Sequence, residues 1–96
     1  MKFLALEIEL PGIDENAYEP HLKDEARRVH QLYLDGILRE IYFRGDKPLA
    51  VIVLECDSLD LARRAIDSLP LVQKGLIQFE VAPLQPYPGW GRLIES

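Results

Sequence analysis

Glu25 is the residue of this 96-residue chain whose type fits its predicted surroundings least. Leu22, Ala26 and Val29 recur at steps of three and four residues, so Glu25 falls within the apolar stripe of a predicted helix. Burial raises the pKa of a carboxyl group and a nearby cation lowers it, which suits Glu25 to general acid or base chemistry. The alternative is a structural role, with Glu25 at the stripe's edge or in an ion pair.

Arg39 is the second residue that suggests chemistry. By strand alternation it shares a face with Ile37 and Ile41, where a guanidinium needs a carboxylate partner. That partner is either a substrate carboxylate or a glutamate of an adjacent strand, and an exposed edge position is a further alternative. His21 precedes Glu25 by four residues, so both side chains lie on one face of the helix.

Four further residues are weaker candidates. Glu7 and Glu80 lie on the first and last predicted strands, where they form either a coupled carboxylate pair or a hydrated interface network. Tyr42 belongs to the polar row opposite Arg39, which is typical of a solvated face. Trp90 lies in a proline-rich tail and either lines a pocket or belongs to an arm that packs on a partner.

Composition excludes several classes of function. Sixteen acidic residues against eleven basic ones give a net charge of −5, which disfavours nucleic acid as a partner. His21, His30 and Cys56 have no metal-ligand spacing, and we expect neither a metal nor a cofactor. One cysteine cannot form an intramolecular disulfide, and no apolar run approaches the length of a membrane span. A cytoplasmic protein without membrane contact is the expectation.

The hydrophobic pattern predicts six elements in the order β-α-β-β-α-β. This order is typical of the ferredoxin-like split βαβ fold, an α+β fold with two helices on one face of a four-stranded antiparallel sheet. We expect one domain over residues 1–82 and, within the same domain, an extended rather than helical C-terminal arm over residues 83–96. The predicted strands cover 3–10, 37–44, 49–55 and 76–82, and the predicted helices cover 19–35 and the segment from Asp57 or Ser58 to Pro70.

The sheet face without helices needs a cover. The alternation of the first strand places Leu6, Ile8 and Leu10 on one face and Glu7 on the other. A mixed face of this kind is too apolar for water, and a chain of this length buries little surface alone, so we expect a homodimer or higher oligomer. The residues expected on the uncovered face are Phe3, Ala5, Glu7, Val51, Val53, Gln78 and Glu80.

Several segments resemble the muconolactone delta-isomerase family of the dimeric α+β barrel superfamily. They are Leu22 to Glu25, Gly36 with Arg39, Ser58, Leu69-Pro70-Leu71, Phe79-Glu80-Val81 and Pro83-Leu84. The resemblance implies back-to-back pairing of sheets and a cofactor-free proton shift on an unsaturated lactone carboxylate. Glu25 and Arg39 match the family's ionisable residues, whereas Tyr42 and the longer tail depart from its pattern.

Two functions fit these residues. The first is an isomerase of a small acid or lactone, in which Arg39 holds a carboxylate and Glu25 moves a proton. His21, Tyr42 and Trp90 would contact the substrate. The second is a non-catalytic dimer that binds a small molecule or supports a partner in the same cleft. Cofactor-free oxygenation rests on fold analogy alone.

Overall fold

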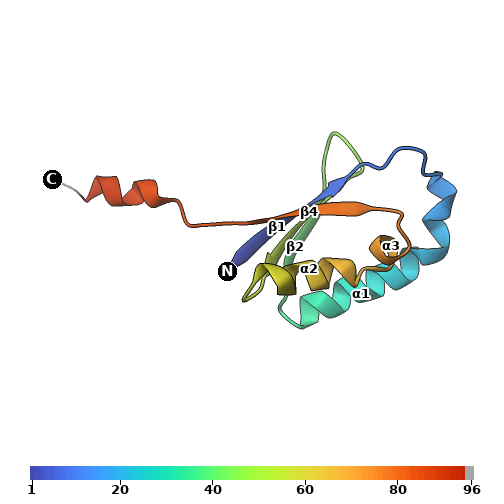
Figure 1. Cartoon of the computed structure of the whole chain (residues 1–96), viewed down its shortest axis with the longest axis horizontal. Coiled ribbons are helices and arrows are strands. Elements are labelled where there is room, and N and C mark those ends of the chain that lie inside the picture. Colours follow the sequence, from blue (N-terminus) through green and yellow to red (C-terminus); the bar gives the residue numbers. More distant parts are fainter. Residues whose placement is uncertain (95–96) are drawn as a thin grey trace.

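The computed structural model describes residues 1–94 of the chain, which form the predicted α+β sandwich (Figure 1). Its four strands pair antiparallel in the order β2-β3-β1-β4, and the helices cover one face of this sheet. The ferredoxin-like fold class is thereby confirmed. The strands are β1 (Lys2–Ile8), β2 (Leu38–Phe43), β3 (Ala50–Glu55) and β4 (Gln78–Pro83), and the helices are α1 (Leu22–Leu34), α2 (Leu59–Asp67) and α3 (Pro70–Gln73).

The core lies between the sheet and the two longer helices. Fifteen hydrophobic residues are buried there, and no polar or charged residue among residues 1–94 is fully buried. Leu32 of α1, Ile66 of α2 and Leu54 of β3 are each at most 2% exposed, so the core joins both helices to the sheet. Burial of side chains of this size is the main stabilising contribution to such a fold.

Local signals in the sequence explain the helix ends. The amide of Ile37 donates to the Leu32 carbonyl at 3.0 Å, and Gly36 has φ +77°, as in a helix terminated by glycine. The Ser58 hydroxyl accepts a hydrogen bond from the Leu61 amide at 3.2 Å and caps α2. Both boundaries agree with the sequence prediction.

Two short elements differ from the prediction. The expected helix over 19–35 is a 3-10 turn, Glu19–His21, followed by α1. The second helix, expected to end at Pro70, ends at Asp67, and a separate helix, α3, begins at Pro70. Proline suits the first position of a helix because the amide there has no partner within the helix. The next residue in α3, Leu71, contributes to the site described below.

The predicted faces of β1 are wrong. Phe3 and Ala5 are 1% and 0% exposed and point to the helices, whereas Leu6 and Ile8 are 37% and 43% exposed on the opposite face. Because β1 is a central strand with apolar residues on both faces, alternation alone did not decide which face meets the core. Glu7 therefore lies on the helix side together with Phe3 and Ala5.

The C-terminal arm projects away from the sheet and helices (Figure 1). The Leu84 amide donates to the Lys2 carbonyl at 2.9 Å, and the chain then leaves the domain. The prediction that the arm contains no helix is wrong, because Pro88–Leu93 forms a 3-10 helix that begins at a proline. The last two residues of the predicted arm, 95 and 96, lie outside the described part of the chain.

Candidate functional site

A cavity of about 530 Å³ lies between α1 and the helix-facing side of the sheet. This volume is in the range of sites for small molecules. Its lining is hydrophobic or aromatic except for Glu7, Glu25 and His30. The other lining residues are Leu22, Ala26, Val29, Tyr33, Leu38, Ile41, Phe43, Ala50, Ile52, Leu71, Ile77 and Phe79.

Glu7 reaches this cavity from the central strand β1. It lies opposite Phe79 of β4 in the sheet register, and its carboxylate accepts a hydrogen bond from the Ala50 amide at 3.0 Å. Burial raises the pKa of Glu7 and the hydrogen bond from Ala50 opposes this, with a net increase above the ordinary value. Glu7 therefore holds a proton more readily than an exposed glutamate.

Glu25 reaches the same cavity from α1. Its carboxylate accepts a hydrogen bond from the Leu71 amide at 3.0 Å, which ties α1 to the beginning of α3. Burial is the main cause of the raised pKa of Glu25; the hydrogen bond from Leu71 lowers this pKa and the charge of Glu7 raises it further. The predicted position of Glu25 on the inner stripe of α1 is therefore confirmed.

The charge of Glu7 also acts on Glu25. It is the smallest of the three causes that shift the pKa of Glu25, and it raises that pKa. Burial has the larger effect, so the apolar lining is the main reason that Glu25 is a stronger base than an exposed glutamate.

A second hollow, of about 360 Å³, lies near the other end of α1. Arg28, Arg64 and Cys56 line it together with Glu55 and Asp57, and none of the predicted site residues does. Its charges of both signs lie near the surface, where solvent screens them, so the Glu7–Glu25 cavity is the stronger candidate site.

Arg39 does not line the cavity. The pairing of β2 with β3 is irregular between Leu38 and Glu40, and this irregularity breaks the alternation on which the predicted face of Arg39 depended. Its Nε donates to the Gly36 carbonyl at 2.7 Å, and its side chain is exposed. Arg39 thus occupies an exposed position on the edge strand β2, which was one of the predicted alternatives, and its role as a carboxylate ligand stays a prediction.

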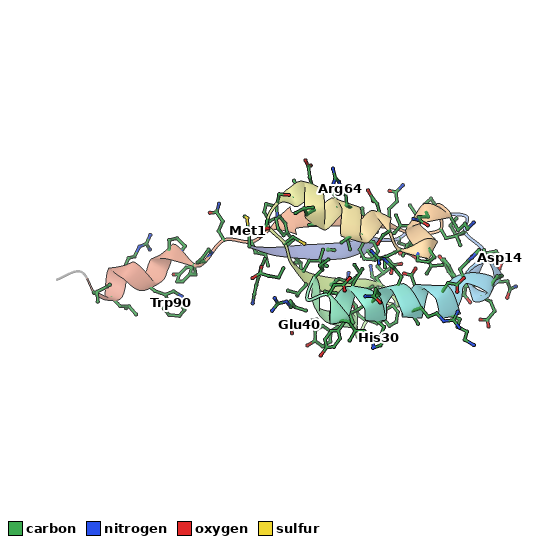
Figure 2. All side chains as sticks on the ribbon, turned by 90° about the horizontal axis from the view of Figure 1, so that it is seen from below. Met1, Asp14, His30, Glu40, Arg64 and Trp90 are labelled. Atoms are coloured by element: carbon green, nitrogen blue, oxygen red, sulfur yellow. The ribbon has the colours of Figure 1, made fainter. Side chains whose placement is uncertain are left out.

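The predicted substrate contacts also lie outside the cavity lining. His21 ends the turn before α1 and is half-buried. Tyr42 lies opposite Val51 on the other sheet face, where its hydroxyl donates to a Glu40 carboxylate oxygen at 2.9 Å. Trp90 lies on the projecting arm, apart from the helices (Figure 2). The roles of His21, Tyr42 and Trp90 stay predictions, since no ligand tests them.

The expected proximity of Glu7 and Glu80 is wrong. Glu80 lies opposite Leu6 in the register of β1 and β4, whereas Glu7 lies opposite Phe79, so the two carboxylates occupy different faces of the sheet. Sequence analysis thus missed the pairing of Glu7 with Glu25. The sequence did contain a signal for Glu7. It alternates with Phe3 and Ala5, so it shares a strand face with two apolar residues.

The described residues offer no ready metal site. In residues 1–94, the His, Cys, Asp and Glu side chains form no group of three that could hold a metal ion. No helix in this range is both long enough and apolar enough to cross a membrane. The polar groups inside the cavity are the chain's own carboxyl groups and His30.

Comparison with solved structures identifies the fold. Muconolactone isomerase superposes with a TM-score of 0.72 at 19% identity over 92% of each chain. The fold of this chain is that of muconolactone isomerase. No protein-family model and no curated protein sequence matches the chain.

A second protein with the muconolactone isomerase fold also matches. It is 5-chloro-2-hydroxyhydroquinone dehydrochlorinase from Burkholderia phenoliruptrix AC1100, in complex with 2,5-dihydroxybenzoquinone. The TM-score is again 0.72, at 15% identity over 88% of this chain and 94% of the dehydrochlorinase. The likeness to both proteins confirms the predicted resemblance at the level of the fold.

The raised pKa of Glu25 predicts a pH-dependent effect of Glu25→Gln on stability. A carboxyl group whose pKa is raised by folding favours the native state below its unfolded-state pKa and loses that contribution as pH rises through the folded-state pKa. Glutamine does not titrate, so Glu25→Gln does not lose stability in this way as pH rises. Its free energy of unfolding should therefore rise relative to that of wild type between pH 4 and pH 7. We expect a change on the order of 1 kcal/mol or less, because solvent screens a half-buried group.

Urea unfolding of both proteins across this pH range measures the difference. Glu7→Gln should behave in the same way, because folding also raises the pKa of Glu7. A difference that stays flat, or that falls as pH rises, would contradict the assignment of both carboxyl groups to an apolar environment.

Proposed function

We propose that the Glu7–Glu25 cavity catalyses a cofactor-free proton shift on a small unsaturated carbonyl compound such as a lactone. The observation that carries this proposal is the placement of two carboxyl groups, both with raised pKa values, in one apolar cavity. A carboxylate with a raised pKa is a stronger base than an exposed one.

The proposed reaction moves one proton within the substrate. Ionised Glu25 removes a proton from the carbon beside the carbonyl group, and the electrons of that C–H bond enter the conjugated system. Glu25 then returns the proton to the distal carbon, so the double bond has moved and Glu25 is again ionised. The charge of Glu7 makes Glu25 a stronger base, because it raises the pKa of Glu25.

The proteins of the same fold support this class of reaction. One is an isomerase of muconolactone and the other a dehydrochlorinase of a chlorinated hydroquinone. Moving a double bond and removing HCl both require a base that accepts a proton, which Glu25 or Glu7 supplies here. The low sequence identities leave the substrate open, so a panel of unsaturated lactones is the appropriate probe.

Proton NMR in heavy water tests the reaction. At least one compound in a panel of muconolactone, its primary amide and substituted butenolides should show deuterium uptake beside the carbonyl group, or isomer conversion, faster than in buffer alone. Glu25→Gln should lower this rate by about 100-fold or more, the usual contribution of a general base. Glu15→Gln is the matched control, because Glu15 is exposed on the turn Glu15–Ala17 outside the cavity lining and should leave the rate within about twofold of wild type.

Two results would contradict the proposal. An unchanged rate in Glu25→Gln would show that Glu25 is not the base. Saturable binding without exchange would make the protein a non-catalytic small-molecule binder, which is the alternative function predicted from the sequence.

We also propose that two chains associate through the sheet face opposite the helices. Leu6, Ile8 and Tyr42 on this face are 37%, 43% and 59% exposed, and Val51 and Val53 lie among them half-buried. An exposed face that mixes apolar side chains with polar ones such as Glu80 is typical of an interaction surface. A second copy offers the same face and would cover it symmetrically.

Sedimentation velocity tests this association. The wild-type protein should sediment at twice the chain mass of 11.0 kDa or more at micromolar concentration. Leu6→Glu should shift it toward the monomer, because a buried unpaired carboxylate opposes association. Leu61→Glu on α2, at a residue 44% exposed, is the control and should not. A wild-type monomer at this concentration would refute the proposed dimer.

A further inference from the structure

Among residues 1–94, the carboxyl groups of the cavity lining have no lysine or arginine beside them in that lining. Its two carboxyl groups belong to Glu7 and Glu25, and the described lining contains neither lysine nor arginine. His30 is its remaining ionisable group apart from the Tyr33 hydroxyl. A cavity that recognises a carboxylate normally offers a cation or several free amides to it. This cavity instead presents two acidic groups to a ligand.

Two candidate arginines are engaged elsewhere. Arg39 donates through Nε to the Gly36 carbonyl and is exposed. Arg28 donates to the Ser68 hydroxyl at 2.8 Å and lines the other hollow. The amides of Ala50 and Leu71 already donate to Glu7 and Glu25, so they are not free to receive a ligand's anionic group.

The two carboxylates would therefore repel an anionic ligand. It would bring a third acidic group next to two that already repel each other in apolar surroundings. An uncharged ligand avoids this repulsion, and its hydroxyl or amide groups can donate hydrogen bonds to the carboxylates of Glu7 and Glu25. The apolar remainder of the lining suits an unsaturated ring.

We propose that Glu7 and Glu25 select ligands that are uncharged inside the cavity and reject carboxylates of the same shape. The ligand class is a small neutral cyclic carbonyl compound, with a hydroxyl or amide group tolerated where a carboxylate is not. This inference rests on the proposed proton-shift function, because it assigns the substrate class of the same cavity. It also replaces the expectation that a substrate carboxylate is anchored by Arg39.

Muconolactone and its primary amide form a matched pair for the test, since they differ in charge and hardly in shape. Titration calorimetry at pH 7.5 should give an affinity for the amide at least about tenfold higher than for the acid, because the acid meets like charges. Glu7→Gln should raise the affinity for the acid about fivefold or more and change that for the amide by less than about twofold. Glu15→Gln, outside the cavity lining, should alter neither affinity.

Three results would overturn the selectivity. They are equal or tighter binding of the acid by the wild type, weaker binding of the acid in Arg39→Met, and binding of neither compound at millimolar concentration. Amide binding without deuterium exchange would instead reject the proton shift and keep the charge selectivity. Exchange of both compounds with equal affinity would reject the selectivity and keep the proton shift.

Discussion

The burial of two acidic side chains against one apolar cavity is the constraint on which the rest of the site depends. Glu7 and Glu25 are each half-buried. Glu7 accepts a backbone hydrogen bond from Ala50, and Glu25 accepts one from Leu71. One hydrogen bond offsets only part of the cost of burying a carboxylate, so both groups favour the protonated form more than in water. The proposed proton shift depends on the raised pKa of Glu25 that results.

The fold explains how four distant parts of the chain meet at this cavity. The central strand β1 carries Glu7, its neighbour β3 begins at Ala50, and α1 crosses the same face with Glu25. The turn of α3 then places the Leu71 amide against α1. The split β-α-β-β-α-β order is what brings the first strand to the middle of the sheet, below the helix that follows it.

The order of elements and the inner position of Glu25 could be predicted because helical periodicity and turn residues are local signals. Three features could not. The faces of β1 were ambiguous since both are apolar, which hid Glu7. The irregularity between Leu38 and Glu40 interrupts the strand alternation at Arg39, and nothing in the local sequence of β2 marks it. The pairing of Glu7 with Glu25 depends on tertiary packing and has no counterpart in sequence spacing.

The coupling of Glu7 and Glu25 is the central claim, and carbon-13 NMR of their carboxyl groups measures it directly. A pH titration of wild type should show both carboxyl groups titrating above the ordinary glutamate value, with Glu25 sensing the ionisation of Glu7. In Glu7→Gln the pKa of Glu25 should fall, because the neighbouring charge that raises it is gone. A Glu25 titration at the ordinary value, or one unchanged by Glu7→Gln, would contradict the account.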